Sequence, residues 1–165
     1  MDFTALITQW LLAYGSIILF VLLALGIIGL PIPDESLLVL AGGLAAQGKL
    51  LVIPTMIAGI AGAIFGISIS FWLGKKVGPW LIRKFGPTLH ITPKTIKIMH
   101  SWFSHMGKWT LVVCYFIPLI RHLAGFVAGT TRLEYKIFAL YAYSGAIIWS
   151  LTFFSLGYFF IIKTQ

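Results

Sequence analysis

The sequence predicts an all-α polytopic membrane protein, organised as an inverted repeat of two units that each hold a re-entrant hairpin and a transmembrane helix. Composition indicates the class. Of the 165 residues, 59% are hydrophobic and only 10% are charged, whereas a soluble domain has about 25% charged residues. Long uncharged runs, and shorter apolar runs broken by proline and charge, indicate the arrangement. A soluble globule and a disordered chain are both excluded.

The first expected element is an N-terminal transmembrane helix over residues 1–27. The run from Leu11 to Pro33 carries no charged side chain, and its first part is long enough to cross a bilayer. The residues before this run lack the basic segment of a cleaved signal peptide. We therefore expect the segment to be retained.

Two further transmembrane helices are predicted over residues 50–74 and 137–162. Neither segment contains Asp, Glu, Lys or Arg, and at about 1.5 Å per residue each can cross about 30 Å of hydrocarbon. In the first segment small residues recur at every fourth position, which favours close helix packing; a smooth track for a lipid tail is the alternative. These small residues are Gly62, Gly66, Ser70 and Gly74.

Residues 28–48 and 109–131 are expected to form two re-entrant hairpins. Each region consists of apolar pieces that are too short to cross a bilayer and lie next to charged or polar residues. These are Asp34 and Glu35 in the first region, and Arg121 and His122 in the second. Such pieces lie at membrane depth where protein or a water-filled cavity surrounds them. Each hairpin precedes one long uncharged span, so the chain contains two similar units.

Basic residues orient the chain. Residues 75–108 carry seven of the twelve Lys and Arg residues and no acidic residue, so the positive-inside rule makes this loop cytoplasmic. The two hairpins then enter the membrane from opposite faces. Within the loop, an amphipathic helix is expected to begin near Thr92 and Pro93. It either lies on anionic headgroups or connects and caps the bundle.

Charged residues at the hairpin tips are the candidates for function. An ionisable side chain at bilayer depth costs about 2.5–3.5 kcal/mol, so Asp34, Glu35 and Arg121 need a reason to be there. If the tips meet, Glu35 and Arg121 share one polar cavity, where arginine binds a phosphate and the carboxylate binds an amine or a proton. An ion pair that only locks the hairpins together is the alternative. Asp34 alone is expected at the membrane interface, solvated by water, and His122 either donates to a headgroup or completes a buried hydrogen bond.

Enzymatic function is not predicted. The sequence contains no nucleophile, phosphate-loop or dinucleotide motif, and its histidines lack the spacing of a metal site. We therefore expect no cofactor and no metal. The aromatic residues of 137–162 are interpreted as packing and interface anchors.

Three ordered motifs resemble those of the DedA family, which is related to the VTT-domain proteins. They are GLPIPDESLLVLAGG at 29–43, FWLGKKVG at 71–78 and FSHMGKWTLVVCYFIPLIRHLAGFVAG at 103–129. The resemblance covers nearly the whole chain, with Glu35 at the family's acidic hairpin position and Arg121 at its second arginine. It implies a multi-pass protein of the bacterial cytoplasmic membrane that translocates lipid. Undecaprenyl phosphate and phosphatidylethanolamine are among the substrates of members, and proton coupling is proposed for some.

Two positions depart from the family pattern. Gly26 stands where many members have a glutamate, and Tyr115 stands where they have their first arginine. We interpret the joint change as removal of a matched acid and base, which favours passive translocation of a net-neutral headgroup. Tyr115 completes the predicted substrate-binding set, which also contains Glu35, Arg121, Asp34 and His122.

The predicted function is a lipid transporter or scramblase that moves a phospholipid, with phosphatidylethanolamine as the candidate, through a polar cavity between opposed hairpins. Undecaprenyl phosphate translocation and a non-transporting membrane scaffold are the alternatives. The expected partners are membrane lipids, with anionic headgroups at the basic loop; homo-oligomerisation is left open. No nucleic-acid partner is expected, although the formal net charge is +8.

Overall fold

The computed structural model describes residues 3–28, 33–85, 97, 101–102, 105–131 and 133–164. Secondary structure within these ranges is entirely helical, which confirms the predicted all-α class. The main helices are α1 (Phe3–Tyr14), α2 (Ser16–Ile28), α3 (Asp34–Ala46), α4 (Val52–Phe85), α7 (Pro118–Thr130) and α8 (Tyr135–Thr164). Before α7 lie three short turns of helix: η1 (Gly107–Trp109), α6 (Thr110–Val113) and η2 (Cys114–Phe116).

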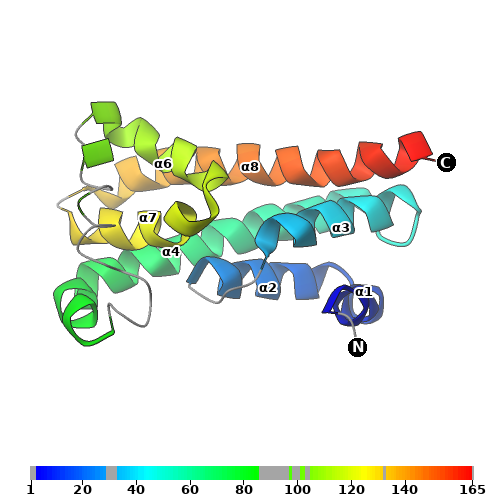
Figure 1. Cartoon of the computed structure of the whole chain (residues 1–165), viewed down its shortest axis with the longest axis horizontal. Coiled ribbons are helices and arrows are strands. Elements are labelled where there is room, and N and C mark those ends of the chain that lie inside the picture. Colours follow the sequence, from blue (N-terminus) through cyan, green and yellow to red (C-terminus); the bar gives the residue numbers. More distant parts are fainter. Residues whose placement is uncertain are drawn as a thin grey trace.

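Helices α4 and α8 form the frame of the molecule. They run along its long axis in opposite directions (Figure 1). Each contains a 26-residue stretch, Val52–Val77 and Tyr135–Phe160, that is long and apolar enough to cross a membrane. These stretches contain most of the two predicted spans. Large apolar side chains remain exposed along them, among them Ile57, Leu140 and Phe159, and such a surface suits a lipid environment.

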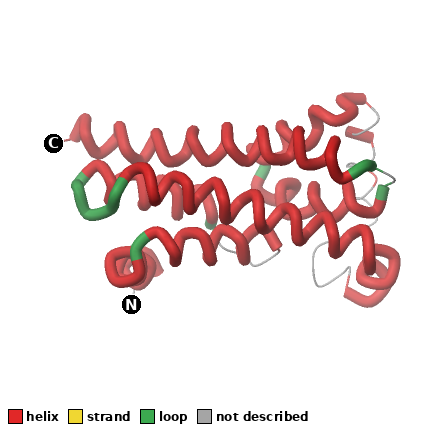
Figure 2. The backbone as a smooth tube through the Cα atoms, turned by 180° about the vertical axis from the view of Figure 1, so that it is seen from behind, coloured by secondary structure: helices red, strands yellow, loops and turns green. Residues whose placement is uncertain are grey.

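The N-terminal segment is not the single transmembrane helix that was predicted. It divides at Gly15, whose φ of +61° is left-handed and whose amide donates to the Leu11 carbonyl at 2.9 Å, a normal way to end a helix. Helix α1 lies across the end of α2 and is seen end-on in Figures 1 and 2. At 13 residues, α2 is too short to cross a bilayer alone.

Two helical segments reverse direction near the middle of the molecule. Figure 1 shows α2 running toward the middle, where α3 begins and runs back to the end at which α4 starts. The segment from η1 to η2 reaches the middle from the other end, and α7 runs back from there. The first of these reversals has α2 as its opening arm, whereas the first hairpin was predicted to begin at residue 28.

Glycines allow two pairs of helices to cross closely. In each pair a Cβ added to the glycine would overlap a backbone carbonyl of the partner helix, so only glycine fits. The two helices of a pair contribute one glycine each. Each glycine contacts a carbonyl of the partner helix, and that carbonyl belongs to the residue three positions before the partner helix's own glycine. The matched contacts are Gly42 with Phe154 and Gly157 with Val39 between α3 and α8, and Gly129 with Phe71 and Gly74 with Phe126 between α7 and α4.

These crossings interlock the two halves of the chain, because α3 of the first half packs on α8 and α7 of the second half packs on α4. Gly62 in α4 makes a further close contact, with the Phe20 carbonyl of α2. At Gly62 and Gly74 the stripe of small residues thus serves helix packing, as predicted.

The basic loop begins later than predicted. Helix α4 continues to Phe85, so residues 75–85 extend the helix. The predicted amphipathic helix falls largely on residues 86–96, 98–100 and 103–104, which lie outside the described residues.

Candidate functional site

The candidate site lies where α3 and α7 begin. Pro118 is in the first turn of α7, after Ile117 in an extended conformation (φ −113°, ψ 106°). Proline suits the first turn of a helix and disfavours helical backbone in the residue before it. The chain therefore bends between η2 and α7, and Arg121 lies in the first turn of the new helix. At the start of α3, Pro33 is the residue before the helix and Asp34 is the first residue in it.

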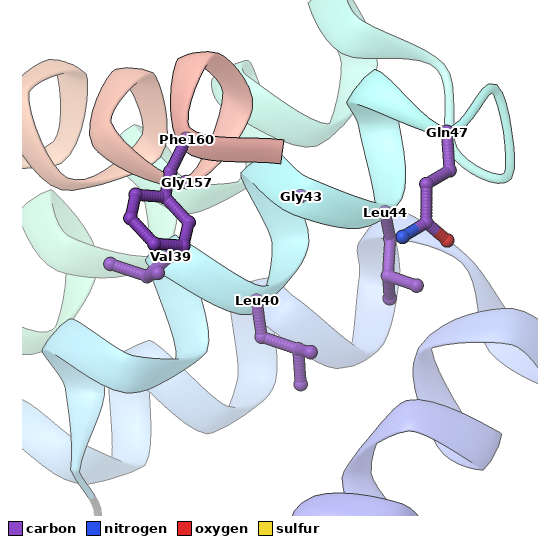
Figure 3. Close-up of a pocket in the computed structure, with 7 residues that line it drawn as sticks. All are labelled: Val39, Leu40, Gly43, Leu44, Gln47, Gly157 and Phe160. Atoms are coloured by element: carbon purple, nitrogen blue, oxygen red, sulfur yellow. The ribbon is translucent and has the colours of Figure 1, made fainter. Parts of the chain in front are cut away.

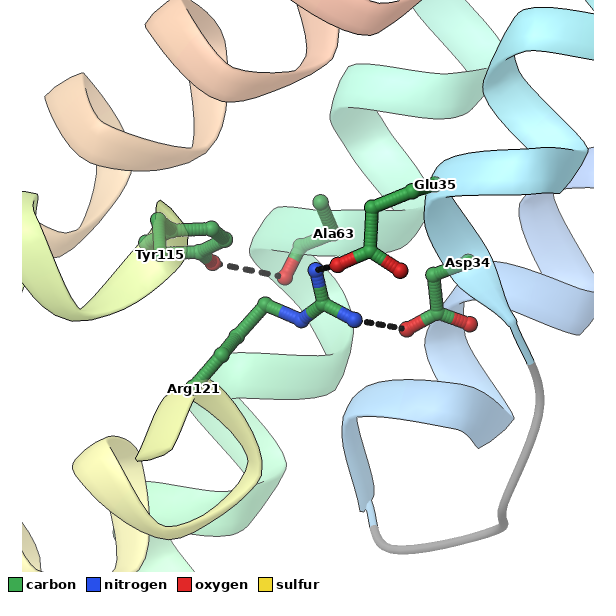
Figure 4. A network of polar contacts seen from close by, with 5 residues as sticks. All are labelled: Asp34, Glu35, Ala63, Tyr115 and Arg121. Carbon is green, nitrogen blue, oxygen red and sulfur yellow. Dashed lines mark hydrogen bonds and ion pairs between the residues drawn. The ribbon is translucent and has the colours of Figure 1, made fainter. Parts of the chain in front are cut away.

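Arg121 joins the two acidic residues of α3. Its Nη1 donates to Glu35 Oε1 at 2.6 Å and its Nη2 donates to Asp34 Oδ2 at 3.1 Å (Figure 4). Asp34 is 0% exposed and Arg121 is 1% exposed, while Glu35 keeps 24% of its side chain exposed. The structure thus brings Glu35 and Arg121 together as expected. The placement of Asp34 in interfacial water is wrong, because the second arm of the guanidinium fork holds this residue inside the protein.

Trp149 of α8 forms a third side of the site. The Arg121 guanidinium carbon lies 4.5 Å from the centre of its ring, a distance at which a cation is attracted to the aromatic face. The residue is fully buried. Sequence reasoning missed Trp149, because one tryptophan among many aromatic residues in an uncharged helix carries no signal that separates a site residue from a packing residue.

Tyr115, another of the five predicted site residues, also lies here. Its hydroxyl donates to the Ala63 carbonyl of α4 at 3.4 Å, beside the guanidinium (Figure 4), and its ring lies 5.9 Å from that of Trp149. Tyr115 therefore connects the cluster to the middle of α4. His122 lies in α7, but its side chain is outside the described residues.

Several buried polar atoms around the site lack a hydrogen-bond partner among the described residues. They are Asp34 Oδ1, Arg121 Nε and Trp149 Nε1. Buried polar atoms are nearly always paired in proteins, so such atoms are suited to meet a ligand. Arg121 and Trp149 offer N–H donors that suit an anionic oxygen, whereas Asp34 offers an acceptor that suits a positively charged donor. No group of His, Cys, Asp and Glu among the described residues is arranged to hold a metal ion.

A mostly apolar groove of about 200 Å³ lies between the later turns of α3 and the later turns of α8 (Figure 3). Along α3, Glu35, Val39 and Gly43 follow one another at intervals of four residues, and positions so spaced share one helix face. The groove thus continues the face that begins with Glu35. Its lining residues are Val39, Leu40, Gly43, Leu44, Gln47, Gly157 and Phe160.

Two bilayer-length helices, an apolar outer surface and an internal ion-pair cluster define a helical membrane protein with a polar site. Residues 32–159 match the VTT domain family. The chain is 30% identical to protein DedA of Escherichia coli K12 over 151 residues, which cover 89% of this chain and 68% of that protein. It belongs to the DedA family of membrane proteins, which carry the VTT domain.

Two Bacillus subtilis proteins are also similar. The uncharacterised membrane protein YbfM is 31% identical over 152 residues, which cover 92% of this chain and 94% of YbfM. Undecaprenyl phosphate transporter A is 29% identical over 135 residues, which cover 82% of this chain and 68% of that protein. No solved structure matches the chain.

Proposed function

We propose that this protein moves lipids between the leaflets of the bacterial cytoplasmic membrane, as a transporter or scramblase and not as an enzyme. The observation that carries the proposal is the cluster of Asp34, Glu35 and Arg121, buried where α3 and α7 begin. Charged groups at this depth are costly and are found where an ion or a polar substrate passes.

The depth of the cluster supports this assignment. Ala63, which accepts the Tyr115 hydrogen bond, lies near the middle of the Val52–Val77 stretch, and Trp149 lies near the middle of Tyr135–Phe160. With α4 and α8 across the bilayer, the cluster is about 15 Å from either surface. The helix pairs that meet there are then two re-entrant hairpins entering from opposite faces, and the matched glycine crossings of α3 and α7 favour an inverted repeat.

The basic end of α4 supports the orientation. Lys75 and Lys76 place their ammonium groups 5.2 Å and 5.9 Å from the ring centre of Trp72, and all three side chains are exposed. Tryptophan and lysine gather at membrane–water interfaces, and lysine is enriched on the cytoplasmic side. We assign this end, with the basic loop that follows it, to the cytoplasmic surface and its anionic headgroups.

The proposed substrate is a phospholipid, with phosphatidylethanolamine as the candidate. Arg121 suits the phosphate, the carboxylates suit the ammonium group, and the groove beyond Glu35 suits an acyl chain. Undecaprenyl phosphate is the second candidate, because of the similarity to a protein named undecaprenyl phosphate transporter A. Its headgroup has no cation, and two carboxylates beside one guanidinium favour a headgroup that carries one.

Transport of fluorescent lipids in vesicles containing the purified protein tests the proposal. We expect faster translocation of labelled phosphatidylethanolamine than in protein-free vesicles, with competition by unlabelled phosphatidylethanolamine. Competition by undecaprenyl phosphate alone supports the second candidate. Rates equal to those of protein-free vesicles for every lipid support a scaffold role and contradict the proposal.

A further inference from the structure

The cluster contains two carboxyl groups and one guanidinium, so it carries one net negative charge when both carboxyl groups are ionised. Of the described side chains, Asp34 and Glu35 have Arg121 as their only charged partner, while the neighbouring helices contribute the uncharged residues Gly26, Tyr115 and Trp149. An uncompensated charge inside a protein is strongly unfavourable. The site is therefore balanced when it also holds one positive charge.

The two oxygens of Asp34 have different surroundings. Oδ2 accepts from Arg121, whereas Oδ1 lies on the α2 side, buried and without a partner among the described residues. A Cβ added to Gly26 of α2 would overlap the Asp34 carboxyl group, and Oδ1 most closely. Glycine inside a helix costs about 1 kcal/mol relative to alanine, so the glycine at position 26 is explained by the space that this carboxylate occupies.

We propose that Asp34 is the cation-accepting carboxylate of the site: Oδ1 either accepts a hydrogen bond from a lipid ammonium group or takes up a proton, while Oδ2 stays on Arg121. This inference rests on the proposed function and deepens it. It also gives a different interpretation of Gly26, which stands where many members of the family have a glutamate. The Asp34 carboxylate fills the space in front of position 26, so the acid has moved to another helix and has not been lost with its base.

Translocation by the Asp34→Asn variant tests the inference, with Glu134→Gln as the matched control because Glu134 is an exposed carboxylate. Labelled phosphatidylethanolamine and phosphatidylglycerol are compared, since only the first has an ammonium group. If Asp34 binds the ammonium group, Asp34→Asn slows phosphatidylethanolamine about tenfold, the effect of one hydrogen bond to a charged group, and spares phosphatidylglycerol. If it binds a proton, both lipids slow and the response to a proton gradient disappears. Wild-type rates and gradient response for both lipids overturn the inference.

A swap of the two residues separates charge from folding. Asp34→Gly should impair translocation, and Gly26→Asp together with Asp34→Gly should restore it, because the carboxylate returns to the same space from α2. The neutral swap, Gly26→Asn with Asp34→Gly, should stay impaired. A folded acidic swap that remains inactive, or a neutral swap that restores activity equally, overturns the inference.

A binding measurement tests Asp34 independently of transport. Thermal unfolding of the detergent-solubilised protein is followed with O-phosphoethanolamine and with glycerol phosphate at pH 6 and pH 8. If Asp34 binds an ammonium group, Asp34→Asn should lose the extra stabilisation that O-phosphoethanolamine gives over glycerol phosphate. If it binds a proton, Asp34→Asn should lose the difference between pH 6 and pH 8. Glu134→Gln should keep both. If wild-type vesicles show no transport, the proposed function fails, and this comparison still decides the role of Asp34. Identical shifts in Asp34→Asn and wild type contradict it.

Discussion

Arg121 and Glu35 lie 86 residues apart in the chain, and their side chains meet with Nη1 and Oε1 2.6 Å apart. Each belongs to the first turn of a helix that begins just after or at a proline. Because the second arm of the guanidinium holds Asp34, the pair links α3 and α7 at the place where the two halves of the chain meet. We expect both stability and the proposed transport to depend on this link.

Removing the guanidinium should destabilise the protein strongly. Arg121→Leu leaves the buried Asp34 carboxylate and the partly exposed Glu35 carboxylate without this partner, and loss of one partner from a buried ion pair costs about 3–5 kcal/mol. Arg121→Lys keeps the charge but not the two-armed geometry, so its effect should be smaller. Thermal unfolding in detergent measures both. The control is Lys136→Leu, since Lys136 is exposed; an Arg121→Leu effect no larger than the control's would refute this role.

The close helix crossings should not tolerate a methyl group. At Gly157 an added Cβ overlaps the Val39 backbone carbonyl, and such overpacking costs about 1–3 kcal/mol. Gly59→Ala is the matched control, because its Cβ would meet only the ends of leucine side chains, the nearest at 3.0 Å. We expect Gly157→Ala to lower the unfolding temperature well below that of Gly59→Ala. Equal unfolding temperatures would show that the helices separate without cost.

Trp149 should contribute to transport beyond packing. Trp149→Phe keeps an aromatic face near Arg121 but removes Nε1–H, which has no partner among the described residues. Loss of an unpaired donor costs little stability and the smaller ring leaves a small cavity, so we expect a modest fall in unfolding temperature together with clearly slower lipid translocation. Trp149→Leu should lower both. Unchanged translocation in a folded Trp149→Phe variant would limit this residue to packing.

The two ends of α4 should be accessible from opposite sides of the membrane. Lys49 and Lys76 are both exposed, one before α4 and one in its later part, and replacing the buried Cys114 by serine leaves a cysteine-free background. In intact cells, a membrane-impermeant maleimide should label Lys49→Cys, whereas Lys76→Cys should react only after lysis. The reverse pattern would invert the orientation, and labelling of both in intact cells would exclude a span between them.

The sequence was sufficient to predict the long helices and the pairing of Glu35 with Arg121, because absence of charge over some 25 residues and charge beside proline are local patterns. The break at Gly15 was missed because glycine is also tolerated inside apolar helices, and only backbone conformation distinguishes the two cases. The extension of α4 beyond Gly74 was missed because charged residues end a membrane span without ending a helix.

Asp34 was misplaced for a different reason. Neighbouring helical residues point about 100° apart, so one of two adjacent acids is easily assigned to water. The guanidinium of Arg121 is wide enough to bind both, and only the position of α7 in space shows this. Trp149 likewise becomes a site residue only through the position of α8.

The translocation rates of Glu35→Gln, Arg121→Gln and the double variant in vesicles test the proposed transport site most directly. If the two side chains bind the headgroup, each single variant should slow translocation about tenfold or more, and the double variant should remain slow even when it is folded. If they only lock α3 to α7, the double variant should fold and move lipid at the wild-type rate. That second result would contradict a transport role for the pair.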